Sequence, residues 1–323
     1  MKKDPKTKSI ISFVKKNGVV VIFFAIIALI AILTEGKNIT PSNLVNILQQ
    51  ATTTGLMTIG MTMVIIDRGI DLSVGGVAAL SSAIGAILMT EYQLPWLLCV
   101  LIMLFIGVFV GFLNGVSIAI LKMPAFITTM AMLKMTQGMA HFILNGTTVF
   151  GLPEIHSVFG QGELLELPVS VWILILFTVL GIILLRYTRF GRELYAMGGN
   201  PRAAWTAGIN VVKNRIAIYI ISGFMSSVAA LIITSRIMCA QVTIGEGSEL
   251  DAIASAVIGG VSMAGGEGGV LGAIIGALII VMINNGLNLL AVSPYLQTAI
   301  KGLVIFTAIA LDVLSRRKEL KGQ

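Results

Sequence analysis

Residues 114–129 read NGVSIAILKMPAFITT, and a degenerate copy of this stretch, NGLNLLAVSPYLQT, occupies residues 285–298. Each copy begins with Asn-Gly, continues with an apolar run, and reaches a proline that a threonine follows four residues later. A shorter match lies upstream of each copy, GIDL at residues 69–72 and GSEL at residues 247–250. Two matches in the same order predict that the chain contains an internal repeat.

The composition of the whole chain is that of a membrane protein. Of its 323 residues, 56% are hydrophobic and only 11% are charged, whereas a soluble domain carries about 25% charged residues. A transmembrane helix needs about 20 apolar residues, and the apolar segments of this chain predict ten such helices. They cover residues 18–34, 44–66, 71–90, 96–121, 126–145, 169–187, 216–238, 251–264, 269–290 and 297–314.

The two copies of the repeat lie five predicted helices apart, and because five is odd they cross the membrane in opposite directions. An inverted repeat of this kind is typical of transporters, whose pathway lies between the two halves near the middle of the membrane. We therefore expect an all-α polytopic membrane protein with about ten transmembrane helices arranged as an inverted repeat.

The lysines and arginines orient the predicted helices, because cytoplasmic loops carry an excess of these residues. Most of the 22 basic residues fall on one side when the N-terminus is placed in the cytoplasm. The chain then has cytoplasmic tails at 1–17 and 315–323 around a transmembrane domain at 18–314, with a cytoplasmic loop at 188–215 and an outer loop at 146–168. Since the basic residues cluster at helix ends without interleaved aromatic residues, the net charge of +7 does not indicate nucleic-acid binding.

The cytoplasmic loop contains GGNPRAAWTAGI, which predicts a short helix with a signal at each end. Asn200 is a suitable N-cap, Pro201 suits the first helical position, and Gly208 suits the end of a helix over residues 202–207. A capped helix between two transmembrane helices favours a protruding element that docks a cytoplasmic partner. The alternative is a solvated loop whose arginines only fix the topology.

Three stretches of the chain, in the order that the family has them, resemble the ribose-type sugar permeases of ATP-binding cassette importers, within the branched-chain amino acid and sugar permease superfamily. TRFGRELYAMGGNPRAAWTAGINV at residues 188–211 is similar to the cytoplasmic loop of that family. DRGIDLSVGGVAAL at 67–80 and ELDAIASAVIGGVSMAGGEGGVLGAIIGALII at 249–280 resemble two further signatures. The resemblance runs from about residue 40 to residue 314.

The resemblance implies a permease subunit of the bacterial inner membrane that imports a monosaccharide such as ribose. It implies cytoplasmic ATPase subunits, a periplasmic or lipid-anchored binding protein, and a second permease copy or a paralogue as partners. ATP and Mg would be bound by the ATPase, so this chain would hold no cofactor. Arg202 stands where the broader superfamily usually has glutamate. The residues that would couple to the ATPase are Gly199, Asn200, Pro201, Arg202, Ala203, Ala204, Gly208 and Ile209.

Neither catalytic residues nor a metal site can be assigned from the sequence. A phosphate-binding loop needs Gly-Lys followed by serine or threonine, but Gly36-Lys37 is followed by Asn38. Cys99 and Cys239 form no CxxC pair, which predicts two structural thiols. We therefore expect a transport subunit and not an enzyme.

Uncharged polar residues within the predicted helices are candidates for the transport route, because neutral hydroxylated solutes can be passed on by transient hydrogen bonds. For each of them, hydrogen bonding between helices is the alternative. Lys134, within the fifth predicted helix, either reaches the membrane surface or lines the route. The repeat places Asn114 and Phe126 at positions that match Asn285 and Tyr295. The candidate route residues are Gln50, Asn114, Phe126, Asn285 and Tyr295.

Charged residues at the predicted helix ends are candidates for partner contacts, with helix capping as the alternative. Asp67, Arg68 and Asp71 lie at an inner turn and would link it to the ATPase interface. On the outer side, the residues that would dock the binding protein are Arg236, Glu246 and Glu249.

Two other functions remain open. The same architecture would serve a branched-chain amino acid, a nucleoside or a sugar-like signal molecule. An ion-coupled secondary carrier is the second alternative, although such carriers usually have an acidic residue deep within a helix, and here the acidic residues lie at the predicted helix ends.

Overall fold

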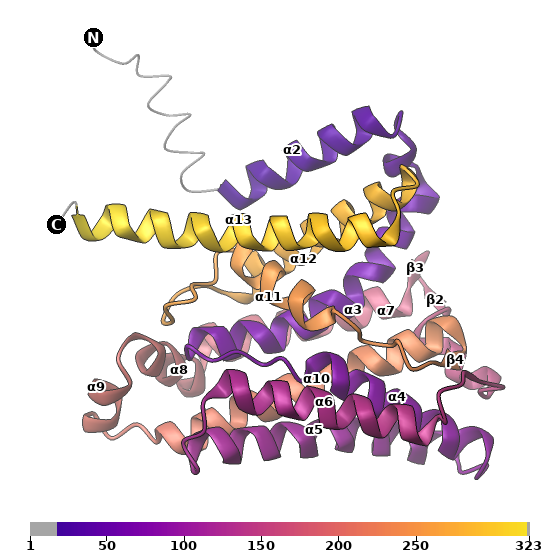
Figure 1. Ribbon diagram of the computed structural model, residues 1–323, viewed down its shortest axis with the longest axis horizontal. Coiled ribbons are helices and arrows are strands. Elements are labelled where there is room, and N and C mark those ends of the chain that lie inside the picture. The colour runs from indigo at the N-terminus through magenta and orange to yellow at the C-terminus, as the bar shows by residue number, and fades with distance from the viewer. Residues whose placement is uncertain (1–17, 322–323) are drawn as a thin grey trace.

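The computed structural model describes residues 18–321 and is almost entirely helical (Figure 1). The predicted tail at 1–17 lies outside the described residues, as do the last two residues of the tail at 315–323. Each predicted transmembrane segment corresponds to a helix. These helices are α2 (Gly18–Leu33), α3 (Pro41–Ile66), α4 (Val74–Thr90), α5 (Trp96–Ala119), α6 (Ala125–Ile143), α7 (Val169–Tyr187), α10 (Val211–Ile237), α11 (Ser248–Ile258), α12 (Val270–Leu289) and α13 (Pro294–Lys321).

The eighth predicted helix, 251–264, differs most from what forms. Helix α11 ends at Ile258, and a loop rich in glycine follows up to Gly269, the residue before α12. Gly260 and Gly265 have positive φ angles of 87° and 79°, a conformation that glycine adopts without strain and that stops a helix. The hydrophobicity of this segment therefore predicted its burial but overestimated its helical length.

Two helices and several short elements join the longer helices. Helices α8 (Arg189–Gly199) and α9 (Pro201–Thr206) lie between α7 and α10, and α8 was not predicted. The remaining elements are the 3-10 helices η1 (Lys37–Ile39) and η2 (Glu154–Phe159), the antiparallel pair β1 (Val149–Phe150) and β4 (Cys239–Ala240), and the antiparallel pair β2 (Glu163–Leu164) and β3 (Leu167–Pro168).

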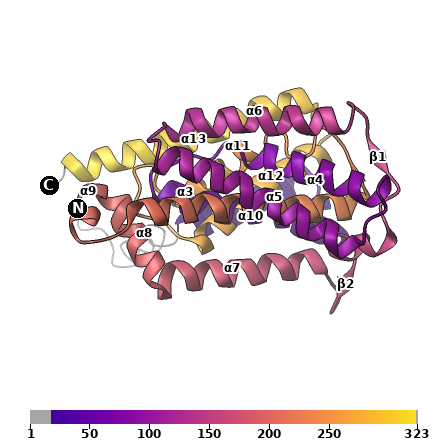
Figure 2. The same cartoon turned by 90° about the horizontal axis from the view of Figure 1, so that it is seen from below.

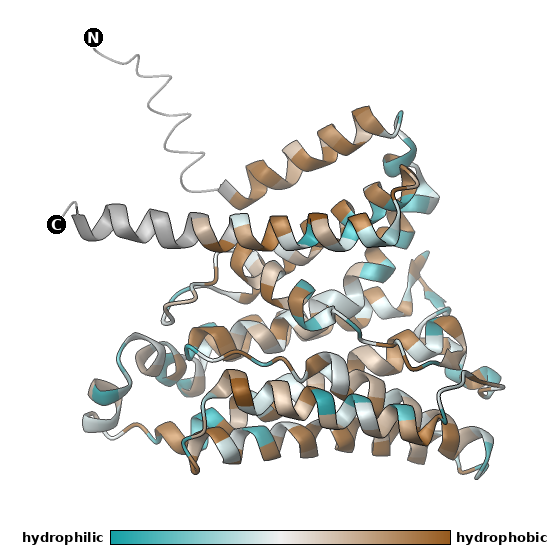
Figure 3. Ribbon diagram, in the orientation of Figure 1, coloured by the Kyte–Doolittle hydropathy of each residue, from teal (hydrophilic) through white to brown (hydrophobic). Residues whose placement is uncertain are grey.

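Several helices have the composition of membrane-crossing segments. Among the described residues, α5, α7, α10 and α12 are both long enough and apolar enough to cross a bilayer, and most of α2 and all of α4 are apolar but shorter. Figure 3 shows that α2 is hydrophobic along nearly its whole length and that hydrophilic residues gather in the segment after it. The protein is an all-α polytopic membrane protein.

The predicted inverted repeat is visible in the packing of α3–α6 and α10–α13. Helix α10 packs against α4 and α5, while its counterpart α3 packs against α11 and α12. GIDL at 69–72 lies just before α4, GSEL at 247–250 lies at the start of α11, and the Asn-Gly pairs lie near the ends of α5 and α12. Helix α6 begins near α9 and leads to β1 beside β4, whereas α13 runs back to the end of the molecule that carries α9 (Figures 1 and 2). The matching helices thus run in opposite directions.

Small residues allow the two halves to approach closely. A side chain at Gly111 of α5 would lie 2.3 Å from the backbone oxygen of Tyr219 in α10, and one at Gly107 would lie 2.3 Å from the backbone oxygen of Gly223. Close backbone contact of this kind is how helices associate in lipid, where burial of apolar surface gives little driving force. The α5–α10 contact therefore joins a helix of the first half to a helix of the second.

The predicted outer loop, 146–168, is held against the end of α10. His156 is fully buried, accepts a hydrogen bond from the indole of Trp96 at 3.2 Å, and lies 3.0 Å from the hydroxyl of Thr234. Burial lowers the pKa of His156 to about 4, so the ring is neutral at pH 7. The hydroxyl of Ser235 donates to the backbone oxygen of His156 and accepts from the backbone N–H of Gly160.

Candidate functional site

Helices α8 and α9 project from one end of the helix bundle (Figures 1 and 2). The side chain of Asn200 caps α9 by accepting hydrogen bonds from the backbone N–H groups of Arg202 and Ala203, both at 3.1 Å. Pro201 occupies the first turn, and Gly208 has a φ angle of 81° just after the helix. The prediction of a capped helix is confirmed, with its limits displaced by one residue to Pro201–Thr206.

The predicted coupling residues are mostly accessible. Trp205 is 72% exposed and, with Gly208 and Ile209, borders a shallow cavity of about 330 Å³. Ala204 is buried against the rest of the molecule. The predicted residues that are exposed are Gly199, Asn200, Arg202, Ala203 and Gly208, and those that are half-buried are Pro201 and Ile209. A partner therefore has access to one face of α9 while the other face is anchored.

Arg68 attaches the projecting element to the end of α3. Its Nε donates a hydrogen bond to the backbone oxygen of Gly198 at 2.5 Å, and its Nη2 donates to the backbone oxygen of Gly199. The backbone N–H of Gly266, in the loop between α11 and α12, donates to the backbone oxygen of Ile66 at 2.9 Å. The junction of α8 and α9 thus lies against segments from both halves of the repeat.

Helix α8 makes two further attachments. The hydroxyl of Tyr195 donates to the backbone oxygen of Gly268 at 2.7 Å. Glu193 accepts a hydrogen bond from the amide of Asn214 in α10 at 2.6 Å and pairs with Arg189 at 2.6 Å. The hydrogen bond from Asn214, followed by that from Arg189, lowers the pKa of Glu193, so this carboxylate stays charged. A displacement of α9 would therefore be transmitted to α3, α10 and the loop before α12.

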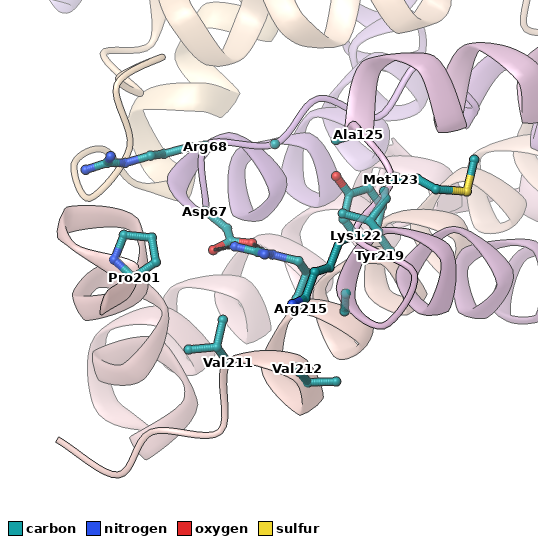
Figure 4. Close-up of a pocket in the computed structure, with 13 residues that line it drawn as sticks. Asp67, Arg68, Lys122, Met123, Ala125, Pro201, Val211, Val212, Arg215 and Tyr219 are labelled. Atoms are coloured by element: carbon teal, nitrogen blue, oxygen red, sulfur yellow. Dashed lines mark hydrogen bonds and ion pairs between the residues drawn. The ribbon is translucent and has the colours of Figure 1, made fainter. Parts of the chain in front are cut away.

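Asp67 and Arg215 form a second link between the two halves at this end. Nε of Arg215 lies 2.6 Å from Oδ2 of Asp67, and Nη2 donates to Oδ1 at 3.1 Å. Figure 4 shows Arg215 reaching toward Asp67, whereas Arg68 points away from this pair. Two of the three predicted inner-turn residues, Asp67 and Arg68, thus contact elements that support α9.

Asp71 has a different place from the one predicted. It is fully buried and accepts hydrogen bonds from the hydroxyls of Ser73 at 2.6 Å and Ser222 at 2.7 Å. Ser73 in turn accepts a hydrogen bond from the amide of Asn114 at 2.8 Å. A direct contact of Asp71 with a partner is excluded by this burial, because the short linker after Arg68 turns inward between α3, α5 and α10.

The two asparagines that the repeat singled out are both engaged in contacts between elements. Asn114 is fully buried in the network around Asp71, and Asn285 exchanges two hydrogen bonds of 2.9 Å with Asn43 of α3. Amide side chains serve equally well as solute ligands and as links between helices. Their placement supports the second role, and a route-lining role for Asn114 and Asn285 stays a prediction.

The other candidate route residues are more accessible. Phe126 of α6 is 52% exposed, Tyr295 of α13 is 89% exposed, and Gln50 of α3 is half-buried. Lys134 lies exposed near the middle of α6, where its amine donates to Gln137 at 3.3 Å. Helices α6 and α13 lie on the same face of the molecule (Figures 1 and 2).

The first turn of α11 contributes charge near this face. Asp251 pairs with Lys301 of α13 at 3.0 Å. Glu249, predicted to dock a binding protein, is half-buried, and its Oε2 is buried beside Gly75 without a hydrogen-bond partner among the described residues. Of the other predicted docking residues, Glu246 is exposed and Arg236 is half-buried.

Comparison with known proteins assigns the chain to a family. Residues 43–309 match the family described as "Branched-chain amino acid transport system / permease component". The chain belongs to this family. The ribose import permease protein RbsC of Haemophilus influenzae is 41% identical to this permease over 92% of the permease and 94% of the relative.

Two further relatives of the permease come from Bacillus subtilis and Escherichia coli. The ribose import permease protein RbsC of Bacillus subtilis is 40% identical over 92% of each chain. The xylose transport system permease protein XylH of Escherichia coli K12 is 32% identical over 92% of the permease and 93% of the relative. No solved structure gives a significant match to the permease.

Some contacts of the permease were not predicted from the sequence. The attachments made by Tyr195, Glu193 and Asn214 depend on α8, whose polar and glycine-containing sequence was assigned to a loop. A helix signal was nevertheless present, because Thr188 is a good N-cap and its hydroxyl accepts a hydrogen bond from the backbone N–H of Gly191 at 3.3 Å.

Proposed function

We propose that this permease is the membrane subunit of an ATP-binding cassette importer and that α9 is the helix that docks on a cytoplasmic ATPase. The observation that carries the proposal is the combination of an exposed, capped helix with attachments to both halves of the membrane domain. A topological loop needs no such attachments. ATP and Mg belong to the ATPase in this proposal, and this chain supplies the mechanical connection.

The proposed location is the inner membrane of a bacterium, with both termini in the cytoplasm. Helix α13 ends on the side of the molecule that carries α8 and α9 (Figure 2). The basic residues of the cytoplasmic loop support placing this side inside. A periplasmic or lipid-anchored binding protein would then deliver the solute to the opposite end, near β1, β4 and the exposed Glu246.

The proposed substrate is a monosaccharide such as ribose. Relatives at about 40% identity along almost the full chain are ribose import permeases, whereas the xylose permease relatives are 31–32% identical. The family description names branched-chain amino acids, so these remain a second candidate substrate class, as do nucleosides and sugar-like signal molecules. An ion-coupled carrier is disfavoured, because a carrier has no use for an anchored docking helix.

The proposed route runs along the face that α6 and α13 share, between this chain and a second copy or a paralogue. Lys134 supports this placement, because an exposed charge near the middle of a helix is costly against lipid and tolerable beside water. Gln50, Phe126 and Tyr295 are the route residues that keep accessible side chains. The asparagines at the matched positions, in contrast, are engaged in hydrogen bonds within the chain, Asn114 with Ser73 and Asn285 with Asn43.

Transport by the reconstituted complex tests the docking assignment. We expect Gly208→Glu to insert normally but to abolish ATP-driven ribose uptake, because the bulky charge would stand where the ATPase meets the end of α9. Gly36→Glu is the matched control, since Gly36 also has a positive φ angle, of 79°, and open space around it, but lies between α2 and η1. Normal uptake by the Gly208→Glu variant would contradict the assignment.

The same vesicles test the substrate and the energy source. We expect ribose, and neither leucine nor uridine, to compete with labelled ribose in the presence of a binding protein and the ATPase. Uptake that an ion gradient drives without any ATPase would show that the protein is a secondary carrier.

A further inference from the structure

A cavity of about 500 Å³ lies where α9 meets the membrane domain (Figure 4). Four segments form it: the linker after α3, the turn between α5 and α6, the start of α9, and the first turns of α10. Its volume is within the range of 300–1,000 Å³ that is typical of small-ligand sites. The coupling function proposed above uses the exposed face of α9 and leaves this cavity unexplained.

The cavity combines an apolar wall with positive charge. Ile118, Met123 and Val212 are among its apolar residues, and the lining cations are Arg68, Lys122 and Arg215. Arg215 is neutralised by Asp67. Lys122 is exposed and has no hydrogen-bond or ion-pair partner among the residues that the structure describes, so its charge is uncompensated.

Two further cations lie next in sequence to residues that line the cavity. Arg202 follows Pro201, which lines the cavity, and Lys213 follows Val212, which also lines it; both charged side chains are exposed. The turn that carries Lys122 is fixed by backbone hydrogen bonds, such as that from Met123 to Ser117 at 3.1 Å. The backbone of Lys122 is therefore fixed beside the cavity, and its side chain lines it.

An exposed apolar surface continues from this mouth. Leu121 is 64% exposed, and Ile120, Phe126 and Ile127 are exposed beside it on the same turn and on the start of α6. A surface that changes from apolar to basic at the end of a transmembrane helix matches the boundary between acyl chains and headgroups in a bilayer. Basic pockets between transmembrane helices at this depth bind anionic lipid headgroups.

We propose that this cavity binds the headgroup of an anionic phospholipid, with the lipid phosphate beside Lys122 and the acyl chains along Ile120 and Leu121. A soluble anion would gain only the attraction to the charge of Lys122, whereas a phospholipid would also cover the exposed apolar surface. A bound lipid would fill the space between the start of α9 and the turn between α5 and α6. It would thereby stabilise the position of the coupling helix.

Native mass spectrometry of the delipidated full chain in detergent tests the proposal, with phosphatidylglycerol and phosphatidylcholine as the added lipids. We expect one phosphatidylglycerol to bind more tightly than phosphatidylcholine. Lys122→Gln should weaken this binding by about fivefold, because a cation near a membrane surface contributes about 1 kcal/mol to the attraction of anionic lipid. Lys122→Glu should weaken it further.

The matched control is Lys37→Gln, because Lys37 lies in η1 at the end of α2 and away from the cavity. This variant should bind phosphatidylglycerol as the unchanged chain does. Equal binding of the two lipids, or an unchanged affinity in both Lys122 variants, would overturn the proposal. Displacement of the lipid by millimolar inorganic phosphate would also overturn it, because it would indicate an anion site. Loss of ATPase binding by the Lys122 variants without loss of lipid binding would overturn it too, because it would indicate a protein contact.

Discussion

His156 shows how one side chain fixes a loop at the end of the helix bundle. The ring has a partner on each nitrogen, the indole of Trp96 and the hydroxyl of Thr234, and burial excludes water from both contacts. A protonated ring could not accept the hydrogen bond from Trp96. The position of the loop at residues 146–168 therefore depends on a neutral histidine.

The free energy of unfolding should decrease in mild acid for this reason. An unfolded histidine has a pKa of about 6.5, and the folded value is about 4, so between these values protons bind the unfolded chain in preference. The stabilisation is complete above pH 6.5 and is lost as the pH falls to 4. We expect a loss of about 2 kcal/mol between pH 7 and pH 5, measured as a lower thermal midpoint in detergent.

Two histidine variants provide the comparison. His156→Gln should be less stable at pH 7 and should lose most of the pH dependence in this range. His141→Gln should keep the dependence, because His141 is exposed at the end of α6. A chain without His156 that retains the full decrease in stability would assign the effect to another group.

At the scale of elements, the position of α8 and α9 depends on their attachments to the helix bundle. Arg68 occupies the left-handed region, with a φ angle of 64°, and from this position it reaches the two backbone oxygens at the end of α8. Those carbonyl groups have no partner within the helix, since the last turn of any helix leaves its carbonyls free. Arg68 therefore completes the end of α8 and joins it to α3.

Arg68→Ala should loosen α9 without unfolding the membrane domain. We expect faster hydrogen exchange across residues 198–208 and ATP-driven uptake reduced by at least about tenfold, because two charge-assisted hydrogen bonds are lost and tenfold corresponds to only about 1.4 kcal/mol. Arg192→Ala is the control, because Arg192 is exposed on α8. Equal hydrogen exchange in the two variants would show that Arg68 does not anchor α9.

The fold also depends on the contact between α5 and α10. Gly111→Val should lower the free energy of unfolding by about 3 kcal/mol or prevent folding. The new side chain would clash with the backbone of α10, which cannot shift without disturbing the helix. Gly138→Val in α6 should be tolerated, because no atom lies within 4 Å of the added group. The yield of monodisperse protein after detergent extraction measures both effects.

At the scale of the whole molecule, the hydrophobic segments and the repeat predicted the architecture well. Ten apolar segments became ten helices, and the exchange of packing partners between α3 and α10 follows the predicted symmetry. Hydrophobicity predicts burial in lipid or protein but not which helices meet. The Asp67–Arg215 pair and the contact of Arg68 with α8 join residues more than 100 positions apart, and no local pattern predicts them.

The candidate site was only partly predictable for the same reason. The caps of α9 are local, so Asn200, Pro201 and Gly208 were assigned correctly as helix signals. The repeat identified Asn114 and Asn285 as special, but a repeat marks structural equivalence and does not tell a link between helices from a solute ligand. Their partners Ser73 and Asn43 became known only from the folded chain.

The orientation of the molecule in the membrane has a direct test. Both cysteines are buried, so a cysteine at the exposed position of Trp205 would be the accessible thiol among the described residues. We expect a membrane-impermeant maleimide to label Trp205→Cys in inside-out vesicles and not in intact cells. Labelling of intact cells would place α9 outside and would remove the proposed ATPase contact.

The interleaving of the two halves limits how this protein moves. Because α10 packs against α4 and α5 of the first half, and α3 in turn contacts α11 and α12, neither half can swing away without separating backbones that touch through glycine. Each polypeptide should consequently move as one rigid body. Opening to alternate sides of the membrane would then take place at the proposed interface with a second permease copy or a paralogue. Distance probes placed within a single chain should record almost no change during turnover.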